Sequence, residues 1–205
     1  MRADSSPGSY AQSLLDYADI GFHENEIARL HARLGDWFAT ADYLGRVVEE
    51  LGRANEEREW TMPEEQVAST RLSLALANVS AYLSVPPAAP LGLLANPSGD
   101  QHTLGLSIAQ PCLRSVGFDT LWVGAGSSAA DLASYIRDSR IALVALSASA
   151  YSTDQVALGA AYRDIASACN HRGAILILCG PGKWPEPIDY GYRCHSFQEM
   201  RDILW

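Results

Sequence analysis

A histidine with a carboxylate two residues before it is the arrangement in this sequence best suited to chemistry. Asp100 and His102 lie in the run 99–105, Gly-Asp-Gln-His-Thr-Leu-Gly, which follows the apolar stretch 91–95. If that stretch is a buried strand, His102 stands at the carboxyl edge of a sheet, where open α/β folds bind their ligands. Asp100 can bind the ring nitrogen that faces away from a metal, which fixes the tautomer and raises the basicity of the ring. Gly105 leaves room for the close approach of a large flat ligand. The pattern predicts a histidine that serves a cofactor.

Length and composition set broad limits on the function. The chain has 205 residues with a formal net charge of −9, enough for one large domain or two small ones. An acidic balance argues against nucleic-acid binding, because phosphate contacts need clustered cations. The longest apolar runs, such as 141–146, are too short to cross a membrane. The amino terminus lacks the apolar core of a signal peptide. We therefore expect a cytoplasmic protein with no nucleic-acid or membrane partner.

The other thiols and imidazoles show no ligand spacing. The four cysteines form no Cys-x-x-Cys pair and are expected to be ordinary buried or half-buried thiols, rather than a zinc site or disulfides: Cys112, Cys169, Cys179 and Cys194. His23 and His31 lie eight residues apart, a spacing that need not place them on one helical face. We expect both at the surface.

Three prolines in the segment 86–90 divide the sequence into two unlike halves. Before them the apolar spacing is helical, as in the stripe Leu44, Val47, Val48 and Leu51. Gly35 is placed to end one helix, and Thr61-Met62-Pro63-Glu64 has capping-box spacing, so the last helix should start near Met62. We predict a bundle of about four helices over 1–85, a proline-rich linker over 86–90 and a second domain over 91–205.

After the linker, strands alternate with helices. Strands are predicted at 91–96, 119–123, 141–147, 174–179 and 191–195, with helices near 103–116, 128–139, 154–171 and 196–204. Wholly apolar strands suit a parallel sheet that is covered on both faces. The predicted fold is therefore α/β: an N-terminal four-helix bundle followed by a flavodoxin-like, doubly wound, five-stranded parallel sheet.

Three loops should meet at the carboxyl edge of that sheet. The first contains Asp100 and His102, the second is the run 146–150 after the third strand, and the third is Cys179-Gly180-Pro181-Gly182 after the fourth. A histidine, small hydroxyl side chains and glycines at one edge describe a long slot for a ligand with a metal at one end and an organic tail.

Residues 91–182 resemble the cobalamin-binding domain. That family carries Asp-x-His-x-x-Gly, which Asp100, His102 and Gly105 match in full. The resemblance implies that His102 is the lower axial ligand of cobalt and displaces the dimethylbenzimidazole base. It implies that Asp100 is the hydrogen-bond partner of His102.

The family's second and third motifs, Ser-x-Leu and Gly-Gly, are matched in part. Ser147 matches the serine, but Ser149 replaces the leucine; Gly180 matches one glycine, but Cys179 stands in place of the other. The resemblance implies that the nucleotide tail lies beside Ser147 and Gly180. It also implies that neighbouring residues of these loops contact the cofactor, namely Gln101, Thr103, Leu104 and Gly182.

The helical half resembles the bundle of cobalamin-dependent light-responsive repressors, in which such a bundle caps the upper face of the corrin. Those proteins carry a tryptophan, nine intervening residues and Glu-His. Here the same spacing holds Asn55, Glu65 and Gln66. An amide is a poorer cobalt ligand than imidazole, so Gln66 departs from the bis-histidine pattern. Asn55 leaves more room above the corrin than an indole would.

That extra room is similar to the cavity of photocobilins, two-domain proteins that hold cobalamin together with a linear tetrapyrrole such as biliverdin. Aromatic residues of the bundle are the candidate bilin contacts, with ordinary packing as the alternative for each: Trp37, Tyr43 and Trp60.

We predict a cobalamin-binding light sensor, with adenosylcobalamin as the expected form and biliverdin as a second chromophore. Photolysis of the cobalt–carbon bond would rearrange the bundle on the α/β domain. No helix-turn-helix motif precedes the bundle, so the output would pass through a homo-oligomer or a separate protein partner. Two alternatives remain open: a corrinoid protein that carries methyl groups between methyltransferases, and a cobalamin-binding regulator that does not respond to light.

Overall fold

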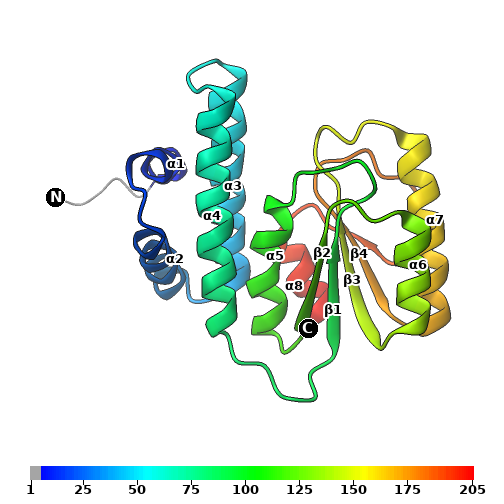
Figure 1. Ribbon diagram of the computed structural model, residues 1–205. Helices are drawn as coiled ribbons and strands as arrows, with labels where there is room; N and C mark the ends of the chain where they lie inside the picture. The colour runs from blue at the N-terminus through cyan, green and yellow to red at the C-terminus, as the bar shows by residue number, and fades with distance from the viewer. Residues whose placement is uncertain (1–5) are drawn as a thin grey trace. The chain divides into compact units, whose positions relative to one another are not determined.

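The computed structural model describes residues 6–205 (Figure 1). These residues fall into two compact units. One comprises the first four helices together with Ser107–Cys112, and the other comprises Val85–Leu106 together with Leu113–Trp205. Between the last helix of the bundle and the first strand, the proline-rich segment 86–90 forms a turn in which the Ala89 N–H donates to the Pro86 carbonyl at 2.9 Å.

The helical unit contains α1 (Pro7–Asp16), α2 (Ile20–Leu34), α3 (Trp37–Glu56) and α4 (Met62–Tyr82). Local sequence sets their ends as predicted. Gly35 ends α2 in the left-handed conformation, at φ 85°. The Thr61 hydroxyl accepts from the Glu64 N–H while the Glu64 carboxylate accepts from the Thr61 N–H, a capping box that starts α4 at Met62.

The interior of the bundle is built from the predicted apolar stripes. Leu44, Val47 and Leu51 of α3 are buried, as are Leu72 and Leu76 of α4. Burying side chains of this size along one stripe per helix is the main source of stability for such a bundle.

The surface positions expected for His23 and His31 are wrong. His23 is fully buried, and its Nε2 lies 2.9 Å from the Tyr17 carbonyl oxygen. His31 is half-buried and its ring stacks on that of Trp37, with centroids 4.2 Å apart. His23 precedes Ile27 by four residues and Leu30 by seven, so it shares their buried face.

The second unit is the predicted five-stranded sheet. Its strands are β1 (Leu91–Ala95), β2 (Asp119–Gly124), β3 (Ile141–Ser147), β4 (Ile175–Cys179) and β5 (Tyr192–Arg193). All pairs are parallel and the order is β2-β1-β3-β4-β5, which is the flavodoxin-like order. β5 is shorter than the predicted 191–195 because only two of its residues pair with β4.

The helices of this unit are α5 (Leu104–Ser115), α6 (Ala129–Asp138), α7 (Gln155–Arg172) and α8 (Phe197–Leu204). α6 and α7 cover one face of the sheet (Figure 1). Under them, Val144, Leu146 and Leu178 form a dry core with Ile136 and Ile165. Burial by the covering helices explains why β3 and β4 are almost wholly apolar.

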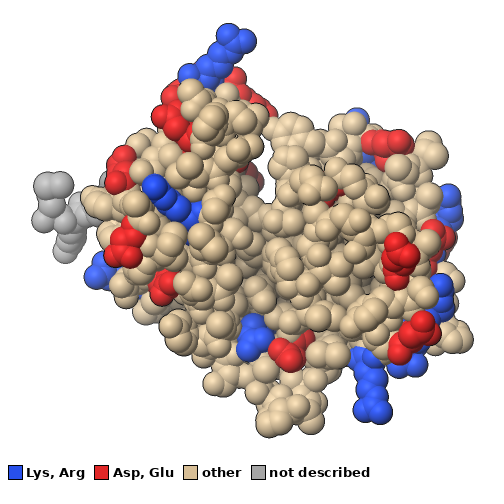
Figure 2. Space-filling model, viewed as in Figure 1, with Lys and Arg blue, Asp and Glu red and all other residues tan. Residues whose placement is uncertain are grey.

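No helix within residues 6–205 is both long and apolar enough to span a bilayer. On the face that Figure 2 shows, the Lys and Arg side chains of the described residues are scattered among acidic ones and form no continuous basic surface.

Candidate metal-ligand site at the carboxyl edge of the sheet

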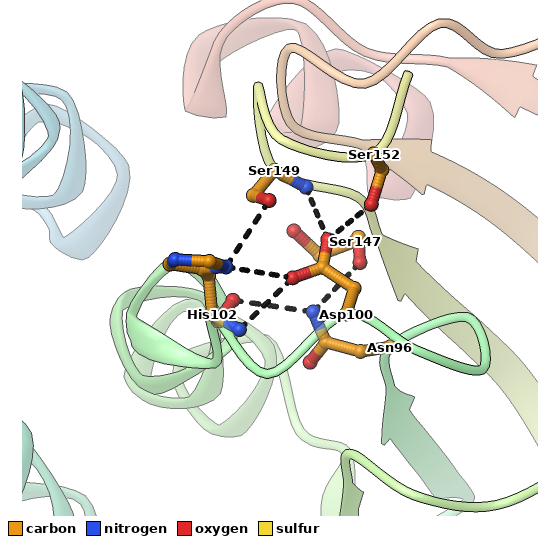
Figure 3. Close-up of polar contacts among 6 residues, drawn as sticks. All are labelled: Asn96, Asp100, His102, Ser147, Ser149 and Ser152. Carbon is orange, nitrogen blue, oxygen red and sulfur yellow. Dashed lines mark hydrogen bonds and ion pairs between the residues drawn. The ribbon is translucent and has the colours of Figure 1, made fainter. Parts of the chain in front are cut away.

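The site lies where the strand order reverses. β1 pairs with β2 on one side and with β3 on the other. Open α/β sheets bind their ligands at such a point, beyond the carboxyl ends of the strands. The loop after β1 carries Asp100 and His102, and the loop after β3 carries Ser149 and Ser152 (Figure 3). The predicted position of the histidine, at the carboxyl edge of the sheet, is therefore confirmed.

The Asp100 carboxylate connects these two loops. Its Oδ1 accepts from the His102 N–H at 2.9 Å and lies 3.1 Å from the His102 Nδ1. Its Oδ2 accepts from the Ser149 N–H and the Ser152 hydroxyl, both at 2.6 Å. Burial raises the pKa of this carboxyl, but the hydrogen bonds from Ser152, Ser149 and His102 outweigh it, so the pKa lies below the ordinary value. Asp100 is therefore a buried and ionised acceptor.

The His102 ring is held at one nitrogen and free at the other. Its Nδ1 faces the Asp100 carboxylate at 3.1 Å and the Ser149 hydroxyl oxygen at 3.3 Å. Because an ionised carboxylate only accepts, we assign the ring proton to Nδ1 and a lone pair to Nε2. Within residues 6–205, Nε2 has no hydrogen-bond partner, and the side chain is 56% exposed. Figure 3 shows the outer end of the ring pointing away from the other labelled residues.

Asn96, directly after β1, fixes the backbone beneath the histidine. Its Nδ2 donates to the His102 carbonyl at 3.2 Å and to the Ser147 carbonyl at 2.9 Å, so it ties the first loop to the end of β3 (Figure 3). Its side chain is fully buried, and its Oδ1 has no hydrogen-bond partner within residues 6–205. A buried acceptor without a partner normally lowers the stability of the fold. Such groups in native proteins often belong to functional sites.

The three predicted loops do converge, and their glycines explain how. A Cβ on Gly105 would lie 3.4 Å from the Ser147 hydroxyl oxygen, and one on Gly180 would lie 3.1 Å from the same atom. A Cβ on Gly180 would also approach the Ala148 carbonyl oxygen to 2.2 Å, and one on Gly182 would approach the Ala148 Cβ to 2.4 Å. Gly180 and Gly182 are therefore required first for the close packing of the third loop on the second.

The remaining predicted residues of these loops lie around the same edge. Cys179 ends β4, its carbonyl accepts from the Ala148 N–H at 3.1 Å, and burial raises the pKa of its thiol far above the ordinary range. Gln101 is exposed, whereas Thr103 and Leu104, at the start of α5, are half-buried.

Arg193 was not singled out from the sequence. Its guanidinium donates to three backbone carbonyls, those of Leu178 at 3.1 Å, Gly180 at 2.6 Å and Cys194 at 2.7 Å. These bonds hold the end of β4 and the glycine loop that follows it. No local motif could reveal this role, because the contacts join β5 to a loop thirteen residues earlier.

In the helical unit, the residues predicted near the upper face of a corrin lie at one end of the bundle. Asn55 is in the last turn of α3, and Glu65 and Gln66 are in the first turns of α4, so both groups flank the α3–α4 connection. Gln66 is exposed, and the Glu65 carboxylate accepts from the Ser69 hydroxyl at 2.9 Å.

The three aromatic residues considered for a bilin differ in burial. Trp37 and Tyr43 are buried in the bundle, and Trp60 is half-buried. Guanidinium groups of Arg33 and Arg46 approach the Tyr43 ring within 5.9 and 5.7 Å of its centroid. For each of the three, contact with a bilin stays a prediction beside ordinary packing.

The donor set around His102 limits the kind of metal it can serve. Among residues 6–205, no group of three or more His, Cys, Asp or Glu side chains could hold a metal ion. A single exposed imidazole nitrogen suits a metal that brings most of its own ligands, as the cobalt of a corrin does. The second nitrogen, bound to a carboxylate, is the usual support for a metal-ligating histidine. The residues present therefore fit a macrocyclic metal cofactor.

No family model and no curated protein matches the sequence. Solved structures do match. The monomethylamine corrinoid protein of Methanosarcina barkeri superposes with a TM-score of 0.67 at 15% identity, over 95% of this chain and 94% of that chain. A cobalamin-binding protein from Desulfitobacterium hafniense matches at 0.43 and 15% identity, over 98% and 97% of the two chains. The methanol:cobalamin methyltransferase complex of M. barkeri matches at 0.47 and 12%, over 95% and 78%.

The fold, a helical bundle followed by a Rossmann-like α/β domain, is thus similar to that of the monomethylamine corrinoid protein. The predicted α/β fold class is confirmed in both halves, from the four helices to the five-stranded parallel sheet.

Proposed function

We propose that this protein binds a corrinoid, with the Nε2 of His102 as the lower axial ligand of cobalt. The observation that carries the proposal is the state of the imidazole. Its Nδ1 is held by a buried carboxylate while Nε2 is left exposed and unpartnered among the described residues, at the reversal point of the sheet. A carboxylate at one ring nitrogen is the usual support of a histidine that ligates a metal through the other.

A bound corrinoid supplies a cobalt centre that can take up and release an alkyl group. The protein's part is to control the imidazole. Asp100 keeps the proton on Nδ1, so the lone pair of Nε2 stays available and gains basicity. The bonds from Ser149 and Ser152 keep Asp100 ionised, so the carboxylate holds the neutral imidazole in the tautomer that leaves Nε2 able to bind a metal.

We further propose that the protein is a methyl carrier that works with methyltransferases. The superposition on the monomethylamine corrinoid protein supports this choice, because it extends over nearly the whole of both chains and includes the bundle as well as the α/β domain. In this role the partners are enzymes that deliver and remove the methyl group. The protein itself contributes the ligand and the enclosure of the cofactor.

Light sensing with adenosylcobalamin, with or without biliverdin, is the second candidate. The spacing of Asn55, Glu65 and Gln66 favours it, because these residues stand where the light-responsive repressors that the bundle resembles carry Trp and Glu-His. Gln66 cannot supply the upper imidazole of those proteins. For this reason we favour the methyl carrier over a light sensor and over a light-independent regulator.

The ligand assignment is tested with hydroxocobalamin. In protein labelled with ¹⁵N-histidine and reduced to the cobalt(II) state, the electron paramagnetic resonance spectrum should show coupling to one ¹⁵N nucleus. His102→Ala should remove that coupling, whereas His171→Ala should retain it, since His171 is an exposed residue in the last turn of α7. Coupling that persists in His102→Ala would overturn the assignment.

The choice between functions is tested by two measurements on the loaded protein. A carrier should accept and donate a methyl group with a methyltransferase, in the dark and in the light alike. A sensor should change its oligomeric state by size-exclusion chromatography after illumination with adenosylcobalamin bound, with a further red absorption band if biliverdin binds. Assembly that responds to cobalamin but not to light, without methyl transfer, would favour the regulator.

A further inference from the structure

Tyr151 lies against the histidine but belongs to none of the sequence motifs. It follows Ser149 in the loop between β3 and α7, and 67% of its surface is exposed. Its ring nonetheless stacks on the His102 imidazole, with centroids 4.7 Å apart and the planes inclined by 23°. This separation is within the range of favourable aromatic pairs. An exposed tyrosine thus uses one face of its ring to cover the proposed ligand.

The backbone that carries Tyr151 is fixed by the same carboxylate that holds His102. Asp100 accepts from the Ser149 N–H and from the Ser152 hydroxyl, on either side of Tyr151. Within the loop, the Ser152 N–H donates to the Ser149 carbonyl and the Thr153 N–H to the Tyr151 carbonyl, each at 3.0 Å. The tyrosine and the imidazole are therefore placed relative to one another by one buried anion.

A contact at Nδ1 alone does not fix the plane of the ring. Asp100 and Ser149 hold one edge of the His102 imidazole, but the ring can still tilt about that edge because more than half of the side chain is exposed. A second aromatic ring lying parallel to it opposes this tilt. Nε2 lies on the opposite side of the ring, so its direction depends on the tilt.

We propose that Tyr151 is a positioning residue for His102, whose ring fixes the plane of the imidazole and so aims Nε2 before the cofactor arrives. The consequence for corrinoid affinity rests on the proposed function. Metal ligation draws electron density from the imidazole, and the face of a phenol ring favours an electron-poor partner. The stack therefore persists and strengthens in the bound state. Because ordering one side chain in advance saves part of the entropy of binding, we expect an effect of about two- to tenfold on the dissociation constant.

The orientation is tested first in the cofactor-free protein. The ring current of Tyr151 should shift the carbon-bound proton resonances of His102 upfield in the nuclear magnetic resonance spectrum. Tyr151→Phe should keep that shift, and Tyr151→Leu should abolish it. Tyr135→Leu is the matched control, since Tyr135 is another exposed tyrosine of the same unit, on α6. His102 resonances that are the same in Tyr151→Leu and the wild type would overturn the proposal.

The consequence is tested by the dissociation constants of hydroxocobalamin and of cobinamide, which lacks the nucleotide tail. Tyr151→Leu should weaken both about two- to tenfold, and Tyr151→Phe neither. In a His102→Ala background, Tyr151→Leu should have no further effect, because a positioning residue acts only through the residue it positions.

Each other outcome has a distinct meaning. Weaker binding by Tyr151→Leu that persists in the His102→Ala background would show direct contact with the corrinoid and overturn positioning. Weaker binding by Tyr151→Phe would assign the effect to the hydroxyl and overturn stacking. Unchanged affinity in Tyr151→Leu would overturn the role in binding. A wild type that binds neither corrinoid would refute the proposed function, while the resonance shifts would still decide the orientation of His102.

Discussion

Replacing Asp100 by Asn removes the charge at the centre of the site and keeps its shape. The carboxylate accepts four hydrogen bonds, two at each oxygen. If the remaining oxygen of Asn stays toward His102, the new NH₂ group faces the Ser149 N–H and the Ser152 hydroxyl. The hydroxyl can rotate and accept, but the Ser149 N–H loses its acceptor. The opposite orientation costs a similar amount, because the His102 backbone N–H loses its acceptor, while the imidazole can move its proton to Nε2 and accept from the NH₂ group at Nδ1.

The expected loss is therefore close to one charged hydrogen bond with its donor left unpaired. Such bonds contribute about 1.5–3 kcal/mol, so Asp100→Asn should lower the free energy of unfolding by about 2–3 kcal/mol at pH 7. Because the pKa of Asp100 is lower in the folded state than the ordinary value of 3.8, the contribution of the carboxylate is fully present above pH 3.8. It is lost as the pH falls through the folded-state pKa.

Urea unfolding of the cofactor-free protein at a series of pH values measures both effects. The difference between wild type and Asp100→Asn should be constant above pH 3.8 and should shrink below it. Asp131→Asn serves as the control, since Asp131 is exposed in the first turn of α6, and it should change stability by less than about 1 kcal/mol. If Asp100→Asn were as stable as the wild type at pH 7, or if the difference grew in acid, the buried ionised acceptor would be refuted.

Three further substitutions test the packing within the α/β unit and within the helical bundle. Gly180→Ala places a Cβ 2.2 Å from the Ala148 carbonyl oxygen and should cost more than about 2 kcal/mol in urea unfolding. Gly126→Ala, also at positive φ, should cost only about 1 kcal/mol, because its Cβ would meet no atom of residues 6–205 within 4 Å other than its chain neighbours. Equal losses would refute the packing argument. Arg193→Met removes the donors to three carbonyls and should cost about 1–3 kcal/mol by the same measurement. Arg201→Met should change stability little, because Arg201 pairs with exposed Asp202. Leu72→Ala should destabilise the bundle by about 2–5 kcal/mol in thermal unfolding, because Leu72 is fully buried. Leu74→Ala, at a half-exposed position of the same helix, should cost under about 1 kcal/mol. A larger loss for Leu74→Ala than for Leu72→Ala would contradict the assigned faces of α4.

The fold could be predicted because its signals are local. The run 141–146 is apolar throughout and lies in the central strand β3, whose residues are almost all buried. Thr61 and Glu64 lie three residues apart and started α4 where the capping box requires. His23 shows where such reasoning failed: we judged it as a polar residue type, although its phase with Ile27 and Leu30 places it on the buried face.

The site could be predicted only in its motif residues. Asp100 and His102 are two positions apart, and their contact follows from that spacing. Ser152 reaches the same carboxylate from 52 residues away, and Tyr151 stacks on an imidazole 49 positions earlier. Contacts of this kind depend on the strand order and on the conformations of two loops. Neither leaves a periodic pattern in the sequence.

The arrangement around Asp100 also separates a ligand role for His102 from a purely structural one. Three of the four hydrogen bonds to the carboxylate come from the backbone N–H groups of His102 and Ser149 and from the Ser152 hydroxyl. These three bonds already join the loops after β1 and β3, so the fold does not need the imidazole. Yet the ring is ordered by a carboxylate, a hydroxyl and a phenol ring while more than half of it faces solvent. Ordering an exposed side chain costs conformational entropy and adds little to the stability of the fold. A ligand that binds at Nε2 would offset this cost, because an ordered side chain binds it with a smaller loss of entropy.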